Sequence, residues 1–142
     1  MGKTRDGFYD AKVECVYDYR SRRVEKRVST SADAGQTWTV SQTRRFLYDG
    51  WLLIAEFDHQ SEINNLKRTH LWGVDLSGTL EDAGGIGGLL RTRLHETIGT
   101  SDYYPTHDAN GNVSEYVDST GAVVAHYEYG PFGNVAAASG LM

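Results

Sequence analysis

The densest group of potential metal ligands lies in the last third of the chain. The oxygen-bearing residues there are Asp108, Asn110, Asn112 and Glu115. Side-chain oxygens of this kind are the ligands that Ca²⁺ prefers, but an EF-hand loop has glycine at its sixth position, whereas Gly111 is fourth from Asp108. Asp, Asn and Gly are also the residues that tight turns favour. We therefore predict that Asp108, Asn110 and Gly111 form a turn rather than a metal site.

A glycine-rich segment, residues 75–90, is the second candidate, because glycine-rich loops can bind phosphate groups. The Walker pattern requires Lys and then Ser or Thr after its last glycine, but Leu89 and Leu90 follow Gly88. A dinucleotide fingerprint that began at Gly85 would need glycine in place of Leu90. We therefore expect a closely packed loop that binds no cofactor.

Catalytic side chains are the third candidate. Acid–base pairs can be drawn between Asp102 and His107 and between His126 and Glu128, but no nucleophile motif accompanies them. The five histidines are separated by 11 residues or more, which leaves no short metal-binding pair. The single cysteine, Cys15, lies in a valine-rich run and is expected to be a small buried residue. The sequence therefore predicts that the protein is not an enzyme and holds no metal.

Composition favours one β-rich domain. The chain has 142 residues, with 16 glycines and 9 tyrosines but only 2 prolines, which is typical of many strands joined by tight turns. A net charge of −5 argues against nucleic-acid binding. The basic residues between positions 20 and 27 alternate with valines, as on a solvated strand face. No apolar run is long enough for a membrane span, and no signal peptide is recognisable, so the localisation is unknown.

Alternation of apolar and polar residues predicts strands along most of the chain. The expected strands are residues 11–19, 22–30, 37–40, 44–49, 51–58, 66–74, 91–98, 113–117 and 122–129. Residues 59–65 are expected to form a polar connection. The strand that begins at Trp51 is apolar on both faces at its start, so we expect it to be covered on both sides.

Glycine turns and aromatic strands alternate in the last third of the chain. The segments 108–112, 118–121 and 130–133 each place Gly or Asn where a tight reversal needs a positive φ angle. An aromatic strand end followed by a turn also occurs near residues 17 and 48, which indicates a degenerate β-hairpin repeat. The residues expected to carry the turns and the repeat are Tyr17, Asp18, Tyr48, Asp49, Asp108, Asn110, Gly111, Gly121, Tyr127, Tyr129, Pro131, Phe132 and Gly133.

These residues resemble the Rhs/YD-repeat proteins, and specifically the Rhs repeat-associated core region, over most of the chain. The resemblance is carried by YDYR at 17–20, RFLYDGWLLIAEFD at 45–58, LWG at 71–73, AGGIGGLL at 83–90 and DANGNVSEYVDSTGAVVAHYEYGPFGN at 108–134. The sequence departs from the family pattern at two turns. Ser21 stands where glycine is usual, and Gly130 stands where Asp is common before Pro-Phe-Gly.

The resemblance implies antiparallel hairpin repeats that form a curved ribbon, part of a spiral β-shell. It implies a single core region over 1–142, with hairpin repeats at 1–74, the glycine-rich loop at 75–90 and core-signature hairpins at 91–142. Such shells enclose or present a C-terminal toxin or effector in bacterial toxins and serve as scaffolds in cell-surface proteins, so the parent protein is expected to be secreted or at the cell surface. The expected partners are the remainder of the shell and the enclosed segment.

The family's self-cleavage motif contains Asp-Pro, but Pro105 and Pro131 are the only prolines and neither follows Asp. We therefore expect a non-catalytic fragment that stops before this motif. Its open strand edges are expected to favour self-association.

A second class of function is a carbohydrate- or receptor-binding module. Trp38, Trp51 and Trp72 could stack on sugars or pack against a surface receptor.

Overall fold

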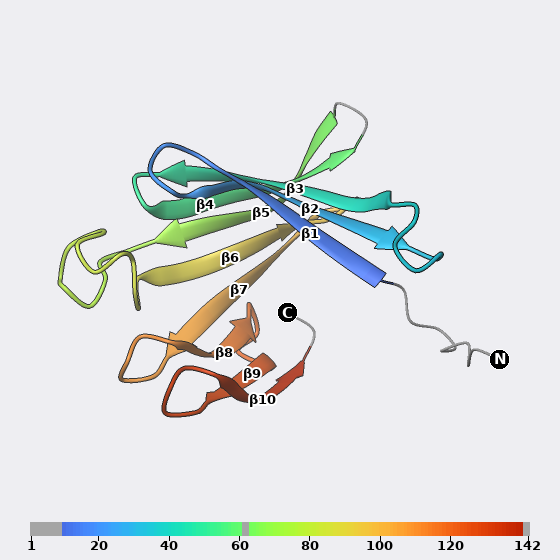
Figure 1. Cartoon of the computed structure of the whole chain (residues 1–142). Coiled ribbons are helices and arrows are strands. Elements are labelled where there is room, and N and C mark those ends of the chain that lie inside the picture. The colour runs from blue at the N-terminus through green and yellow to red at the C-terminus, as the bar shows by residue number, and fades with distance from the viewer. Residues whose placement is uncertain (1–9, 61–62, 141–142) are drawn as a thin grey trace. The chain divides into compact units, whose positions relative to one another are not determined.

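A computed structural model describes residues 10–60 and 63–140, and every regular element in this part of the chain is a β-strand (Figure 1). The strands are β1 (Asp10–Tyr17), β2 (Arg23–Ser31), β3 (Thr39–Asp49), β4 (Leu52–Gln60), β5 (Ile63–Trp72), β6 (Leu89–His95), β7 (Thr100–His107), β8 (Val113–Asp118), β9 (Val123–Tyr129) and β10 (Val135–Gly140). They form one open sheet in sequence order, in which the neighbouring strands are antiparallel. The predictions of an all-β fold and of antiparallel hairpins are confirmed.

The chain divides into two compact units. Unit 1 comprises residues 1–46 and 57–65, and unit 2 comprises residues 47–56 and 66–142. Strands β3, β4 and β5 each contribute residues to both units. The family-based boundaries at 74 and 90 stay predictions.

Several strand boundaries differ from those expected. The two short strands at 37–40 and 44–49 are one strand, β3, and most of the expected connection at 59–65 belongs to β4 and β5, with residues 61–62 outside the described part. The expected strand at 91–98 ends at His95. The sequence predicts three strands in a meander within residues 103–135 but gives bounds for only two of them, so neither β7 nor β10 has predicted bounds. β10 consists mainly of Ala, Ser and Gly, whose low β-propensity is overridden by pairing with β9.

Unit 1 contains the β1–β2 hairpin, in which Val13 pairs with Val28 and Cys15 with Lys26. The expectation that Cys15 is buried is wrong, because its side chain is only partly covered. The buried positions of β2 are instead polar, namely Ser29 and Ser31. Within the described part of the chain, Cys15 is therefore a partly exposed strand residue.

Unit 2 has a very small hydrophobic core. Leu52, Ala55 and Ala125 are the hydrophobic residues that are buried in the described part of the chain, whereas twenty large hydrophobic residues there are exposed. β4 supplies two of the three buried residues, but Trp51, at the start of the expected strand, is 52% exposed, so the expectation that this strand is covered on both sides is met only in part. The indole N–H of Trp72 donates to the Leu53 carbonyl at 2.7 Å. Backbone pairing and polar contacts therefore carry much of the stability that a hydrophobic core would usually provide.

Candidate functional site

The most distinct recurring element is a five-residue turn between neighbouring strands. It occupies residues 18–22, 108–112, 118–122 and 130–134. In each copy the N–H of the first residue donates to the carbonyl of the fifth, at 2.7–2.9 Å, and the N–H of the fourth donates to the carbonyl of the first, at 3.0 Å. The fourth residue has a positive φ in every copy, and it is Ser21, Gly111, Gly121 or Gly133. One local geometry therefore closes four of the hairpins.

A carboxylate stabilises three of these turns. The Oδ1 atoms of Asp18, Asp108 and Asp118 accept hydrogen bonds from the N–H groups of the third and fifth turn residues, at 2.8–3.1 Å. The second oxygen of Asp18 accepts from Arg22 Nε at 2.8 Å, and that of Asp108 accepts from Asn112 Nδ2 at 2.9 Å. Asp18, of the Tyr-Asp pair at 17–18, is therefore a turn residue whose carboxylate accepts hydrogen bonds from the backbone N–H groups of the turn.

The other predicted repeat residues lie in different settings. Asp49 ends β3 and is followed by a two-residue connection, in which Gly50 has a φ of 54°. Tyr48, beside it, is half-buried. Pro131 and Phe132 occupy the middle of the last turn, where Phe132 is 97% exposed. The Tyr-Asp pair at 48–49 therefore does not form the five-residue turn.

The tyrosines of the repeat also differ in exposure. Tyr17 is exposed, whereas Tyr127 and Tyr129 on β9 are half-buried. The Tyr129 hydroxyl donates to the Val113 carbonyl at 2.9 Å. The tyrosines of β9 therefore contribute to contacts between strands, whereas Tyr17 faces solvent.

The residues considered as calcium ligands do not converge on one point. Both Asp108 oxygens accept hydrogen bonds within the turn, whereas Glu115 lies on β8 and contacts His126 Nδ1 at 3.3 Å. Within residues 10–60 and 63–140, no three His, Cys, Asp or Glu side chains are placed to hold a metal ion. The arrangement around Asp108 is therefore that of a hydrogen-bonded turn.

A fifth copy of the turn lies in the glycine-rich segment, at residues 75–79. Asp75 N–H donates to the Thr79 carbonyl at 2.6 Å, Gly78 N–H donates to the Asp75 carbonyl at 2.9 Å, and Gly78 has a φ of 80°. The second oxygen of the buried Asp75 accepts from the N–H groups of Ala83 and Gly85, at 2.8 and 3.1 Å. The turn at Asp75 was not predicted from the sequence, although its spacing Asp-x-x-Gly is the same as at Asp108 and Asp118.

The N–H groups of the glycine-rich loop are used inside the loop itself. Gly84 donates to Glu81, Ile86 to Ala83 and Gly88 to Gly85, all through backbone carbonyls. A phosphate-binding loop presents such groups to the ligand instead. This geometry agrees with the expected closely packed loop.

The turn at 108–112 packs against this loop. A Cβ atom on Gly111 would lie 2.5 Å from Ile86 Cγ2 and 3.1 Å from the Gly87 nitrogen. Trp72 and His107 line the same junction, which leaves an open hollow of about 340 Å³. The two most distinctive sequence segments, DANGN and AGGIGG, therefore contact each other, and only glycine at position 111 permits this approach.

A chain of buried polar groups crosses unit 2. The Glu56 Oε1 atom lies 3.2 Å from His70 Nε2, and His70 Nδ1 lies 3.1 Å from Thr92 Oγ1. Glu56 and Thr92 are only 8% and 2% exposed. Tyr116 continues the chain through a hydrogen bond with Thr92, and burial raises the pKa of Tyr116. These four polar residues were not predicted from the sequence to interact.

This polar chain has the order carboxylate, imidazole and hydroxyl, which is also the order in a catalytic triad. Thr92 is nevertheless buried, and its hydroxyl is hydrogen-bonded to both His70 and Tyr116. Arg68 Nη1 lies 3.9 Å from Glu56 Oε1 at the other end. The arrangement satisfies buried polar groups and aligns strands, and it offers no open position for a substrate.

The acid–base pairs considered from the sequence are arranged differently. The Asp102 carboxylate accepts two hydrogen bonds from Arg93, at 2.7 and 2.8 Å, and the Arg93 side chain lowers its pKa. His126 Nε2 lies 3.3 Å from Glu128 Oε1, so the second pair is brought together. The hydrogen bond with Glu128, with a further contribution from Glu115, raises the pKa of His126. The Arg93–Asp102 contact links β6 to β7 and the His126–Glu115 contact links β9 to β8, whereas His126 and Glu128 both lie on β9.

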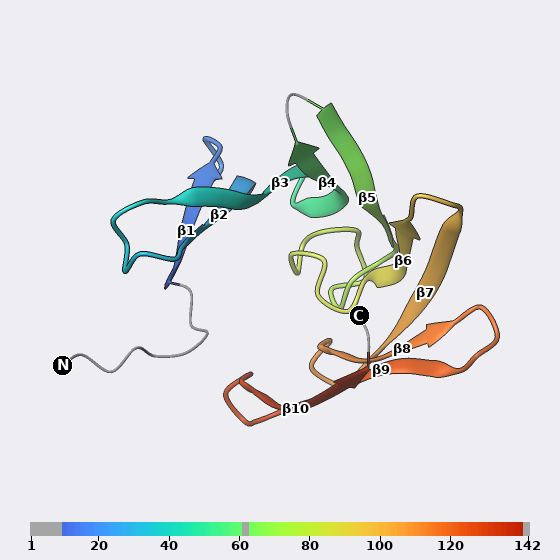
Figure 2. The same ribbon diagram turned by 90° about the vertical axis from the view of Figure 1, so that its right-hand side faces the viewer.

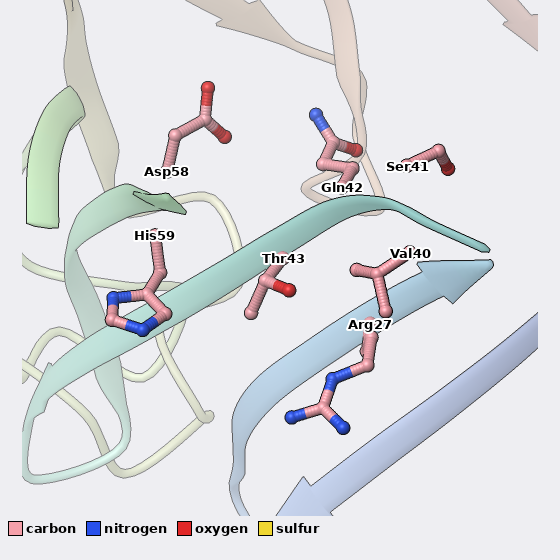
Figure 3. A pocket seen from close by; sticks show the side chains of 7 residues that line it. All are labelled: Arg27, Val40, Ser41, Gln42, Thr43, Asp58 and His59. Atoms are coloured by element: carbon pink, nitrogen blue, oxygen red, sulfur yellow. The ribbon is translucent and has the colours of Figure 1, made fainter. Parts of the chain in front are cut away.

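An open hollow of about 610 Å³ lies in unit 1. Its lining residues are Arg27, Val40, Ser41, Gln42, Thr43, Asp58 and His59 (Figure 3). Figure 3 shows Gln42 and Asp58 on one side of the β3 ribbon and Thr43 and His59 on the other, as expected for consecutive strand residues. Because these polar groups diverge, one ligand cannot contact all of them, and we assign no ligand to this hollow.

Ser21 provides a direct test of the turn geometry. Its φ of 62° is unfavourable for a residue with a Cβ atom. We expect Ser21→Gly to raise the free energy of unfolding by about 0.5–1 kcal/mol, since the relief of strain exceeds the added entropy of the unfolded chain. Urea denaturation measures the change. Ser119→Gly, at a turn position without a positive φ, is the control and should be destabilising; a stabilising control would contradict the explanation.

Acid should weaken the connection between β2 and β3. Hydrogen bonds from the Thr37 hydroxyl and then the Ser31 hydroxyl lower the pKa of Asp33 from 3.8 to about 2. Because the folded-state pKa is below the unfolded one, the stabilisation is complete above about pH 4 and is lost as the pH falls toward 2. A carboxyl NMR titration should give a midpoint near 2 for Asp33. A midpoint at the ordinary value would refute these hydrogen bonds, and Asp33→Asn should remove this part of the acid sensitivity.

No helix in the described part of the chain is long and apolar enough to span a membrane. Comparison of the sequence with protein-family models and with curated proteins found no match.

Proposed function

We propose that this chain is a non-catalytic wall segment of an Rhs/YD-repeat shell, which would enclose or present a C-terminal toxin or effector. The observation that carries the proposal is the recurrence of one five-residue turn between strands that pair in sequence order. In three of the four copies between paired strands, Asp is the first residue of the turn. A sheet built in this way grows by adding further hairpins, and each hairpin needs contacts only with its neighbours. These same turns lie in the segments that resemble the Rhs core signature, and this resemblance is the reason for proposing a wall of the Rhs type.

The distribution of hydrophobic residues supports a role within a larger assembly. Large apolar side chains, such as Val13, Leu71 and Leu90, are about half exposed on strands. An isolated soluble domain usually buries such residues in its own core. In a shell, adjoining repeats or an enclosed segment would cover them.

The chemistry of the carboxylates favours a structural role over a catalytic one. The hydroxyl of Ser77 and the side chain of Asn112 are the main causes that lower the pKa of Asp75 and Asp108, and backbone N–H groups add to both shifts. Carboxylates held ionised by their own turns stabilise those turns. They are poor candidates for general acids near neutral pH.

Urea unfolding of the chain tests the proposal. A wall segment with little core should unfold over a broad transition, with an m-value of about 1 kcal/mol/M or less, and should bind the hydrophobic dye ANS before unfolding. A steep single transition without dye binding would indicate a self-contained domain and would contradict the proposal.

The alternative function, carbohydrate or receptor binding, is favoured by the partial exposure of Trp38 and Trp51, at 41% and 52%. A glycan array with the wild-type chain and the Trp51→Ala variant distinguishes the two functions. Binding that is lost in the variant would favour the alternative, whereas a wall segment should bind no glycan. Trp72 is unsuitable for this test, because its N–H donates to the Leu53 carbonyl and its replacement would also remove that hydrogen bond.

A further inference from the structure

Asn110 is the one asparagine in the sequence that precedes a glycine. The residues that follow Asn64, Asn65, Asn112 and Asn134 are Asn, Leu, Val and Val. The backbone nitrogen of the residue after an asparagine can attack the side-chain carbonyl carbon of that asparagine. Glycine permits this attack best, because it has no Cβ atom in the way and its backbone turns most freely. The sequence therefore directs spontaneous deamidation to Asn110.

This reaction needs only the chain and water. The Gly111 nitrogen loses its proton to water or hydroxide and forms a bond to the side-chain carbonyl carbon of Asn110. The bond from that carbon to the side-chain nitrogen breaks, and the nitrogen takes up a proton and leaves as ammonia. Water then opens the resulting cyclic imide at one of its two carbonyl groups, which yields aspartate or isoaspartate. Either product adds a negative charge, and isoaspartate also adds one methylene group to the backbone.

The turn at 108–112, which joins β7 to β8, holds the reacting nitrogen in place (Figure 2). The Gly111 N–H donates to the Asp108 carbonyl at 3.0 Å. Gly111 also lies against the glycine-rich loop, where a Cβ atom on it would be 2.5 Å from Ile86 Cγ2. Because proton loss and attack both use the Gly111 nitrogen, its N–H must first leave the Asp108 carbonyl. The reaction therefore requires local opening of the turn.

We propose that Asn110 is a deamidation site that the turn at 108–112 protects, so that its modification follows the opening of this turn. Burial does not provide the protection, because Asn110 is exposed. Asp108 provides it instead. Its carbonyl accepts from Gly111, and its Oδ1 atom accepts from the backbone N–H groups of Asn110 and Asn112 at 2.8 and 3.0 Å. These three hydrogen bonds hold the turn closed.

Isoaspartate at position 110 would disturb the junction between this turn and the glycine-rich loop. The extra backbone atom would displace Gly111, whose Cβ position is already 2.5 Å from Ile86 Cγ2 and 3.1 Å from the Gly87 nitrogen. Closely packed contacts tolerate little displacement. Deamidation would therefore loosen the junction irreversibly. The inference goes beyond the proposed function and does not depend on it, because a wall segment and a glycan-binding module would share this turn.

Mass spectrometry of proteolytic peptides tests the protection, after the 142-residue chain has been kept in mildly alkaline buffer with or without guanidinium chloride. We expect deamidation at Asn110 to be at least about tenfold slower in the native chain than in the unfolded chain. Asp108→Ala should accelerate the native reaction and leave the unfolded rate unchanged.

Asp118→Ala is the matched control. The Oδ1 atom of Asp118 accepts the corresponding hydrogen bonds in the next turn, at 2.8 and 3.1 Å, so its loss should leave the rate at Asn110 unchanged. A native rate equal to the unfolded rate would overturn the inference. So would a failure of Asp108→Ala to accelerate the reaction, or an equal acceleration by Asp118→Ala.

The stability of the modified chain gives a second readout. Wild-type chain that has formed isoaspartate while unfolded, and is then refolded, should unfold at a lower urea concentration than the wild type. Asn110→Asp adds the same charge with an ordinary backbone and should unfold near the wild-type midpoint. Equal midpoints of the isoaspartate form and Asn110→Asp would contradict the predicted loosening of the junction. These outcomes leave the urea m-value and glycan experiments unaffected, so the two proposals are tested separately.

Discussion

Replacement of Gly111 by alanine is expected to lower the free energy of unfolding of unit 2 by about 2–4 kcal/mol. The φ of 79° costs a residue with a Cβ atom about 1–2 kcal/mol. The new methyl group would also lie 2.5 Å from Ile86 Cγ2 and 3.1 Å from the Gly87 nitrogen, and overpacking of this kind adds about 1–3 kcal/mol. Urea denaturation followed by tryptophan fluorescence measures the sum, because Trp72 lies at the same junction.

Gly121→Ala separates the two contributions. Gly121 occupies the same position in the next turn, with a φ of 86°, but no atom lies within 4 Å of its Cβ position. This control should therefore lose only the backbone contribution of about 1–2 kcal/mol. If Gly111→Ala and Gly121→Ala were equally destabilising, the turn at 108–112 would not pack against the glycine-rich loop.

Replacement of Thr92 by valine is the second large effect. Valine keeps the size and the branched Cβ, so the variant removes mainly the hydroxyl that joins His70 to Tyr116. Loss of partners for buried polar groups should lower the free energy of unfolding by about 1–3 kcal/mol. The hydrogen bond with Thr92 also lowers the pKa of Tyr116, so its loss should raise that pKa further. Ultraviolet titration of the tyrosines measures the shift.

Thr92→Ser is the matched control for this variant. Serine keeps the hydroxyl and loses one methyl group, so it should cost stability but leave the pKa of Tyr116 unchanged. Equal pKa values of Tyr116 in the wild type and in Thr92→Val would show that Thr92 does not join the polar chain to Tyr116.

Local signals in the sequence were sufficient for most of the fold. Asn110-Gly111 and Thr120-Gly121 indicate tight turns because glycine alone readily adopts a positive φ, and the structure has both turns. Strand ends were harder to predict, because pairing with a neighbour extends a strand beyond its own propensity. β7, which contains Pro105, forms because both flanking strands, β6 and β8, pair with it.

The buried polar chain could not be predicted, because no local pattern connects its members. Glu56 and His70 are 14 residues apart, and His70 and Thr92 are 22 residues apart. Only the strand register, which places His70 directly opposite Thr92, brings them together. Asp75 is different. Its spacing to Gly78 matches that of the recognised turns, so a search for Asp-x-x-Gly throughout the chain would have found it.

Native-state amide hydrogen exchange is the most direct test of what holds this chain together. It distinguishes strand pairing and five-residue turns from one shared hydrophobic core. We expect graded protection, with the slowest exchange in β4, β5 and β6 around Glu56, His70 and Thr92, and the fastest in β1 and in the outer edge of β10. If all strands instead exchanged through a single opening with one free energy, one shared core would hold the chain together as a cooperative globular domain, which would contradict this expectation.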